Sequence, residues 1–540
     1  MTTGDSFQDQ EVGSDAGELP WERHPSIYEH ICAHIRRGQP GLTEGGQTLP
    51  DETPADPKKR LKGFAAVEGV AAHHAGRAKN GEHISLVDAL IRYCQTPNDA
   101  TRLEVYNLMK TENAVRLVDN LLNSLCESPF GSHARLYELA LFLAMMSPDQ
   151  GPVKFGVAIL GLFRRNEDIE ILLALGRHEG LALYCAVAIA NSSYRPDADL
   201  WALAKNLGGW GRISVVERMT GTNDPEIKEW LLRRGYRNTI MYEYLALACA
   251  KGGGLLEALR RERVDRELLT CAGEIIRALI RGAPGPGMGR YDQGAEAAQA
   301  FLNRVPTDSP SLGDICTVHA IKEFITKANQ DWADIAGGSW SDELRSRVTE
   351  QCEQIIALPI VREIVSANLA SPKDRHFNQA ARVAPSLGID TWDYHWKRLR
   401  QTPQDSGRWD RVMRACDESR IDEVMSLAEQ SLPLDQLAAK SENGKGSANG
   451  SDSQVWVHGC LDMILQDLKR FPGRGVKLLL AGLQSPVVGN RNMAVKAVAG
   501  WKRDVWPAEL KSTLKQVYRS ERDPKIRHRI KTLLNGHAKR

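Results

Sequence analysis

The sequence lacks the features of a secreted, membrane-spanning or disulfide-stabilised protein. Its 540 residues contain ten cysteines, scattered from Cys32 to Cys460 with no CxxC pair, which indicates neither a disulfide framework nor a zinc ribbon. Apolar runs such as Leu139 to Met146 are far short of the roughly 20 residues that a spanning helix needs. No Lys or Arg precedes Arg23, so the basic start of a signal peptide is missing. We therefore expect a cytoplasmic protein without a membrane partner.

Motifs for cofactor binding and catalysis are also missing. The segment Gly282–Gly289 has neither GxGxxG nor a following Lys-Ser/Thr, so it does not form a phosphate-binding loop, and we interpret it as a linker. His30 and His34 have the i, i+4 spacing of metal ligands, but no other residue has ligand spacing, and a polar helix face explains them as well. We predict no catalytic residue, no metal site and no cofactor, although a triad assembled from distant residues stays possible.

Charge is nearly balanced overall but unevenly distributed. The formal net charge is +2, whereas residues 502–540 hold twelve Lys/Arg and four Asp/Glu, and the first twenty residues hold acids alone. The near-neutral total is not typical of a dedicated nucleic-acid binder, so nucleic acid is possible but not favoured. The basic end is either a solvated end of a helical stack or a site for an acidic or phosphate-bearing partner.

What the sequence does contain is a repeating cadence of short apolar helices separated by Gly- or Pro-marked turns. Expected helix starts pair a capping residue with proline, and this series is Thr96-Pro97, Ser147-Pro148, Asp224-Pro225, Ser371-Pro372, Ser485-Pro486 and Asp523-Pro524. Apolar residues then recur at an average spacing near 3.6 residues, as at Ile526, Ile530 and Leu533. No segment shows the alternation of apolar and polar residues that is typical of a strand. Short turns make neighbouring helices antiparallel. The pattern predicts an all-α fold, an α-solenoid of antiparallel helix pairs.

The last repeats resemble HEAT-repeat proteins. Ser485 and Asp523 are 38 residues apart, near the period of two-helix repeats, and Asp523-Pro524-Lys525-Ile526-Arg527 is similar to the HEAT second-helix start. The resemblance implies a HEAT/armadillo-like stack. We expect four regions: an acidic disordered N-terminus with a short helix and a linker (1–57), two helical-repeat regions (58–283 and 290–440), and C-terminal HEAT-like repeats with a basic end (454–540).

Two aromatic and basic segments are candidate binding sites. In Gly208-Gly209-Trp210-Gly211-Arg212, the glycines allow close backbone approach at a helix N-terminus, where an anion or acidic partner would dock. The second segment, residues 392–400, has tryptophans at i, i+4 beside cations. This combination suits stacking on bases or sugars, or anchoring of a protein interface. Ordinary packing between helices explains both segments as well. The candidate binding residues are Trp210, Arg212, Trp230, Trp392, Trp396, Arg398 and Arg400.

A further resemblance concerns the N-terminal half. The segments 209–218, 230–235 and 238–246, with His24–Tyr28 before them, are similar to a bacterial family often labelled limonene hydroxylase. The label implies an oxygenase, which needs a metal or flavin, yet the chain has no Glu-x-x-His and no dinucleotide fingerprint. We favour a non-enzymatic scaffold that binds a protein partner along an extended groove. The alternative is an enzyme on a helical-repeat fold, either that monooxygenase or a HEAT-like DNA glycosylase using Trp392, Trp396, Arg398, Arg400 and Asp410.

Overall fold

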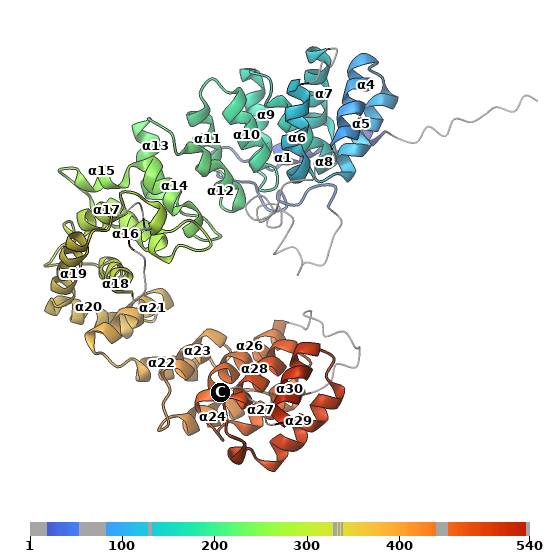
Figure 1. Cartoon of the computed structure of the whole chain (residues 1–540). Coiled ribbons are helices and arrows are strands. Elements are labelled where there is room, and N and C mark those ends of the chain that lie inside the picture. Colours follow the sequence, from blue (N-terminus) through green and yellow to red (C-terminus); the bar gives the residue numbers. More distant parts are fainter. Residues whose placement is uncertain are drawn as a thin grey trace, which may run out of the picture. The chain divides into compact units, whose positions relative to one another are not determined.

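The computed structural model describes residues 19–52, 83–127, 132–327, 332, 335, 339–438 and 452–535. Within these ranges the chain forms helices and turns and no strand, which confirms the predicted all-α fold. Helices pack as neighbouring pairs along the chain, as in an α-solenoid (Figure 1). The acidic N-terminus before residue 19, which we expected to be disordered, and most of the stretch between the expected regions 290–440 and 454–540 lie outside the described residues.

The chain divides into two compact units, residues 1–358 and 359–540, and the division lies inside the region expected at 290–440. The first unit opens with five helices that pack around one another: α1 (Ile27–Ala33), α4 (Ile84–Gln95), α5 (Asp99–Thr111), α6 (Ala114–Glu127) and α7 (His133–Met146). The next helix, α8 (Gln150–Leu160), is apolar apart from Gln150 and Lys154 and is buried along most of its length, because α5, α6, α7 and α10 surround it.

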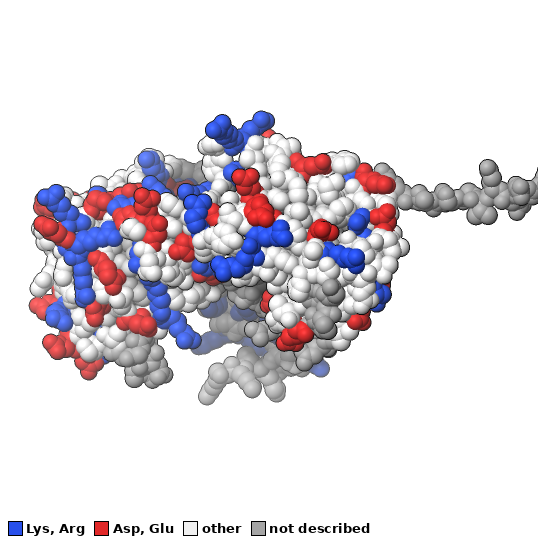
Figure 2. All heavy atoms as spheres, turned by 90° about the horizontal axis from the view of Figure 1, so that it is seen from above, with Lys and Arg blue, Asp and Glu red and all other residues white. Residues whose placement is uncertain are grey.

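From α8 onward the first unit is built of two rows of helices. In one row, each helix packs on the next: α8, α10 (Ala182–Ser192), α12 (Trp210–Val216), α14 (Glu243–Gly253), α16 (Arg266–Arg281) and α18 (Leu312–Thr326). The other row covers it: α9 (Ile169–Leu175), α11 (Pro196–Ala204), α13 (Pro225–Trp230), α15 (Leu255–Arg260), α17 (Gly294–Leu302) and α19 (Asp342–Ile356). The face seen in Figure 2 has acidic and basic side chains interspersed over it.

The second unit repeats this arrangement on a smaller scale. It begins with α20 (Pro359–Leu369), α21 (Asp374–Val383) and α22 (Trp392–Gln401). One row then contains α23 (Ser406–Ala415), α26 (Asp452–Asp467), α28 (Val488–Ala499) and α30 (Pro524–Asn535). Beside it lie α24 (Ile421–Ser431), α25 (Leu434–Ala438), α27 (Val476–Gln484) and α29 (Ala508–Ser520).

The proline-marked helix starts fall into two groups. At Asp224 and Asp523 the helix begins at the following proline, because each carboxylate accepts two backbone N–H groups of the first turn. After the four Ser/Thr-Pro pairs the helix begins three residues beyond the hydroxyl residue, so those predicted starts are wrong by two residues. The residue before a proline is held extended, which delays the helix. For α5 the later residue Asn98 provides the cap, whereas the N-cap residues of α8, α21 and α28 make no side-chain cap.

Arginine side chains join helix pairs by capping helix C-termini. Arg135 donates to the last two carbonyls of α4 at 2.8 and 3.1 Å, and Arg304 donates through Nε to a carbonyl of α15 at 3.1 Å. Arg470 reaches the end of α23 in the same way, at 3.0 Å. The last carbonyls of a helix have no intrahelical donor and carry partial negative charge, so a guanidinium group satisfies both needs.

Candidate functional site

The turn Gly208–Gly211, where we expected an anion to bind, holds a carboxylate of the chain itself. Glu179, from the turn between α9 and α10, accepts the backbone N–H groups of Gly208 at 3.1 Å, Gly209 at 2.8 Å and Gly211 at 2.6 Å. A carboxylate is favoured at this position because the N–H groups of a helix N-terminus are unpaired and carry positive charge. A Cβ on Gly211 would lie 2.7 Å from the Cβ of Ala182, so a glycine is needed for this approach.

Arg212 lies beneath this turn and ties three backbone segments together. The side chain is 9% exposed, and its Nη1 donates to the carbonyls of Ala204 at 2.9 Å and Leu207 at 3.1 Å. Its Nη2 donates to the carbonyl of Arg234 at 2.7 Å, and its guanidinium carbon lies 4.9 Å from the ring centroid of Trp230. Burial lowers the pKa of the Arg212 guanidinium. The residue therefore links α11, α12 and the segment before α14.

The two tryptophans of the first predicted set pack around the same turn. Trp210 is 8% exposed and meets the ring of Tyr244 edge-on at 4.9 Å. Trp230 is half-buried and meets Trp201 at 6.5 Å, and the ammonium group of Lys205 lies 3.8 Å from the Trp201 ring centroid. The structure thus brings Trp210, Arg212 and Trp230 together, in positions where they pack around the Gly208–Gly211 turn.

The second predicted set lies in the other unit and is largely part of its core. Trp392 and Trp396 stack at 5.8 Å with an interplanar angle of 13°, and they are 6% and 9% exposed. The guanidinium carbon of Arg420 lies 4.7 Å from the Trp392 ring centroid. Arg400 is exposed, whereas Arg398 is half-buried. These tryptophans fill the space between helices, as the packing interpretation expected.

Arg398 is held by several partners on α21 and before it. Its Nη1 lies 2.6 Å from a carboxylate oxygen of Asp374, its Nη2 donates to the carbonyl of Ser371, and the guanidinium lies 4.0 Å from the Phe377 ring centroid. On the same helix as Arg398, burial and two nearby arginines lower the pKa of His395 to about 4. The second set therefore connects α21, α22 and the helices after it.

Sequence reasoning missed a long polypeptide segment that lies on the first unit. Residues 19–52, which we call the strap, contain α1 and otherwise turns. Trp21 anchors the start of the strap, with its ring edge-on to Tyr106 at 5.7 Å and Phe142 at 5.5 Å. The backbone N–H of Ile27 donates to the carbonyl of Ser147 at 2.9 Å, at the turn between α7 and α8. Four apolar strap residues are buried: Trp21, Ile27, Ile31 and Leu49.

The end of the strap crosses successive inter-helix turns. The carboxylate of Asp51 accepts both the backbone N–H (2.8 Å) and the side-chain amide (3.1 Å) of Gln150, at the start of α8. The side chain of Gln47 donates to the carbonyl of Arg177 at 3.2 Å and accepts the backbone N–H of Glu179 at 3.2 Å. Glu179 therefore connects the strap on one side with the Gly208–Gly211 turn on the other. We call this line of turns, from α7–α8 to α11–α12, the turn edge.

His178 lies in the same contact and is held neutral. It is 4% exposed, its Nδ1 accepts the backbone N–H of Gly180 at 3.2 Å, and its Nε2 lies 3.4 Å from the carbonyl oxygen of Gln47. Burial, together with the nearby Lys154 and His30, lowers the pKa of His178 to about 4. The contact between the α9–α10 turn and the strap is therefore made by the neutral form of the His178 ring.

The turn edge continues beyond the strap as an exposed loop. Thr239 donates through its backbone N–H to the carbonyl of Gly208 at 2.7 Å, which fixes the loop before α14 next to the α11–α12 turn. The side-chain oxygen of Asn238 accepts the N–H groups of Ile240 at 2.9 Å and Met241 at 2.7 Å, so the loop is internally braced. Ile240 is 36% and Met241 42% exposed. The loop thus presents two apolar side chains on a fixed backbone.

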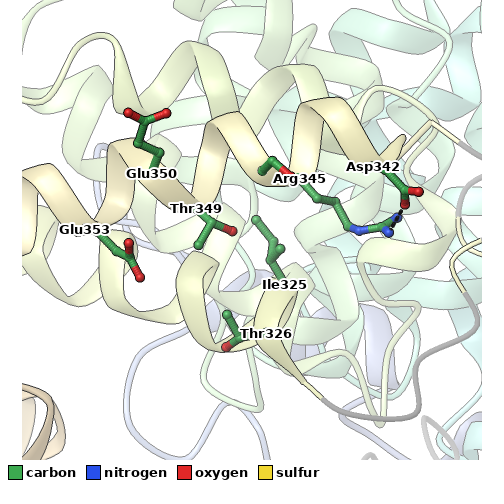
Figure 3. Close-up of a pocket in the computed structure, with 8 residues that line it drawn as sticks. Ile325, Thr326, Asp342, Arg345, Thr349, Glu350 and Glu353 are labelled. Atoms are coloured by element: carbon green, nitrogen blue, oxygen red, sulfur yellow. Dashed lines mark hydrogen bonds and ion pairs between the residues drawn. The ribbon is translucent and has the colours of Figure 1, made fainter.

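An open groove lies between α18 and α19 at the end of the first unit. It has a volume of about 470 Å³ and contains Ile325, Thr326 and Thr349, and Figure 3 shows Glu350 pointing away from it. Its charged rim is already paired, since Arg345 bonds Asp342 and the carboxylate of Glu353 lies 3.0 Å from Lys322. The groove therefore has few free polar groups with which to orient a ligand.

In the part of the chain that the structure describes, no three His, Cys, Asp or Glu side chains lie close enough together to hold a metal ion. No described helix combines the length and apolar character needed to cross a membrane. No protein-family model, curated protein or solved structure matches this chain.

Proposed function

We propose that this protein is a helical-repeat scaffold that binds an extended segment of a protein partner along the turn edge. The observation that supports this proposal is the strap, a segment of short helices and turns that the same surface already holds. Its contacts use backbone groups of the turns together with a few polar side chains, such as Gln47 and Asp51. A partner segment with similar groups would find equivalent contacts where the edge continues.

The place for the partner is the loop that follows the strap-covered turns. Ile240 and Met241 are exposed there, and the hydrogen bonds of Asn238 and Thr239 hold the loop rigid before binding. Rigid presentation lowers the ordering cost of association, and apolar anchors contribute most of the energy at small interfaces. In this proposal Trp210, Arg212 and Trp230 position the edge, and a partner contacts the loop above them.

Peptides selected from a random phage-displayed 16-mer library on the full-length chain test this proposal. The double variant Ile240→Asp/Met241→Asp should weaken the selected peptides at least about tenfold, because burying a carboxylate against an apolar ligand costs more than 1.4 kcal/mol. The matched control is Val487→Asp/Val488→Asp, which changes two side chains that are 36% and 49% exposed in the other unit. Equal binding to both variants, or a failure to select any peptide, would refute the proposal.

The strap itself provides a second test. A protease site inserted after Pro57 in the full-length chain allows the strap to be cut from the unit after folding. We expect the strap fragment to co-elute with the remainder, because Trp21, Ile27, Ile31 and Leu49 are buried against it. Release of the fragment upon cleavage would show that the turn edge does not hold the strap by its own contacts.

The oxygenase implied by the limonene hydroxylase resemblance is an alternative that rests only on the few segments quoted for that resemblance. Its test is direct: an absorption spectrum and a metal analysis of the purified full-length protein. Stoichiometric iron or flavin would favour the enzyme over the scaffold.

A further inference from the structure

The last helix pair of the second unit carries a concentration of unpaired positive charge. Residues 502–540 have a net charge of +8, whereas the whole chain has +2, so the other residues sum to −6. Ten Lys and Arg fall within the described residues 502–535, and all ten are exposed. Of the four acids there, Glu521 is buried and Asp523 caps α30, which leaves Asp504 and Glu509 exposed.

These cations have fewer polar partners than many arginines in the rest of the described chain. Elsewhere many arginines cap helix ends or pair with carboxylates, as Arg474 does with Asp422 at 2.7 Å. Within this group Arg503 bonds the carbonyl of Leu534 at the end of α30, and Arg529 bonds the side chain of Asn492. None of the ten cations forms an ion pair with an acidic side chain among the described residues. A polar face is expected on a terminal repeat for solubility, but mixed charges would meet that need, as on the face in Figure 2. The large excess of positive over negative charge points to an anionic partner.

The cations form adjacent rows along α29 and α30, which pack side by side (Figure 1). Lys511 and Lys515 precede Tyr518 by seven and three residues, positions that share a helix face, and Lys531 follows Arg527 by one turn. The guanidinium carbon of Arg527 lies 5.4 Å from the ring centroid of Tyr518, which brings the two rows together. Successive cations within a row are about 6 Å apart along the helix axis.

The chemistry of this surface selects among anionic partners. No large apolar side chain is exposed on the described residues of α29 and α30, and Trp501 and Trp506 before them are 5% and 4% exposed. Tyr518 on this face is half-buried with the Arg527 guanidinium over its ring, and Val505 before α29 is 40% exposed. The surface therefore offers little stacking area for unpaired bases and little apolar area to anchor a protein or a membrane. The remaining candidates are partners with closely spaced phosphates, which positive charge alone can bind, such as the backbone of a nucleic-acid duplex. We propose that the α29–α30 surface binds double-stranded nucleic acid through its phosphates, without sequence preference.

Fluorescence anisotropy of a labelled 25-bp DNA duplex with the full-length protein tests this proposal. The dissociation constant should rise steeply with salt, by about 500-fold between 50 and 200 mM if five cations contact phosphates. The variant Lys511→Gln/Lys515→Gln/Lys531→Gln should make the slope of log K against log salt shallower by about 2.7, and weaken binding about 500-fold at 0.1 M salt. Duplexes of unrelated sequence should bind equally.

The control Lys373→Gln/Lys397→Gln/Lys496→Gln removes the same charge from three exposed lysines elsewhere in the second unit. It should shift binding far less than the α29–α30 variant, and an equal shift would overturn the proposal. Absence of duplex binding at 50 mM salt would also overturn it. So would tighter binding of poly-glutamate or of vesicles with 30% anionic lipid, because the surface would then serve an acidic protein or a membrane. The peptide-selection and strap tests involve the other unit, so either proposal can fail alone.

Discussion

Replacement of Glu179 is the sharpest test of how the turn edge is built. Its carboxylate accepts three backbone N–H groups, from Gly208, Gly209 and Gly211, at 2.6 to 3.1 Å. Loss of one helix N-cap acceptor costs about 0.5–2 kcal/mol, and a hydrogen bond to a charged group contributes about 1.5–3 kcal/mol. Water reaches this half-buried site and replaces part of the loss. We therefore expect Glu179→Ala to lower the free energy of unfolding by about 2–4 kcal/mol.

The Glu179→Gln variant separates hydrogen bonding from charge. The amide oxygen still accepts one or two N–H groups, but the amide nitrogen is a donor and cannot accept a third. An intermediate loss of about 1–2 kcal/mol follows. The matched control is Glu104→Ala, because Glu104 pairs with Arg92 at 2.5 Å on the surface of the same unit, where such a pair contributes less than about 1 kcal/mol.

Guanidinium denaturation followed by circular dichroism measures the loss, and hydrogen exchange locates it. In Glu179→Ala the amides of Gly208, Gly209 and Gly211 should exchange faster, while amides elsewhere in α12 retain their protection. If the free energy of unfolding of Glu179→Ala stays within about 0.5 kcal/mol of that of Glu104→Ala, the carboxylate does not hold the turn, and the reasoning fails.

Three further predictions concern single side chains. Gly285→Ala places a Cβ 2.1 Å from a carbonyl oxygen at the start of α14, so thermal denaturation should show a loss of about 1–3 kcal/mol, whereas Gly221→Ala, with nothing within 4 Å, should be neutral. The folded pKa of His178, about 4, lies below its ordinary value near 6.5, so its stabilisation is present at pH 7 and declines as pH falls from 6.5 to 4. Urea midpoints at pH 7 and 5 should show about 2 kcal/mol less acid destabilisation in His178→Gln, and equal acid destabilisation would contradict the buried neutral ring. Arg491→Ala leaves the carboxylate of Glu521, whose side chain is 1% exposed, without its partner at 2.8 Å. We expect the free energy of unfolding to fall by about 3–5 kcal/mol, with partial rescue in the double variant Arg491→Ala/Glu521→Ala. No rescue would contradict the pairing.

Much of the fold follows from local sequence, and the errors have a physical cause. The helix cadence and the absence of strand patterns predicted the all-α fold, and Asp224 and Asp523 marked helix starts correctly. The Ser/Thr-Pro pairs misled because the residue before proline is held extended, so the helix begins two residues beyond the proline. In α5 the later residue Asn98 provides the cap, whereas Val487 before α28 makes no side-chain cap.

The candidate site was predicted only in part, because its defining contacts are long-range. The glycines of the 208–211 turn marked a helix N-terminus, but the carboxylate that fills it comes from Glu179, about thirty residues earlier. The strap contains many Gly, Pro and Thr residues, a composition typical of linkers, and a few side chains such as Gln47 attach it. A glutamate within a Gly-flanked turn was the available signal, and nothing local identified its partner.

The arginine caps determine where a helix pair can be deleted from this chain or duplicated in it. Arg304 bonds the carbonyl of residue 259, and Arg470 bonds that of residue 413, so each cap spans more than one helix pair. Both arginines stand in the pattern Leu-x-Arg-apolar-Pro. Deleting or duplicating a helix pair at its turns would separate a guanidinium from its carbonyls and leave both without partners. The exchangeable module for engineering or gene duplication is therefore a block that begins before the capped helix and ends after the arginine.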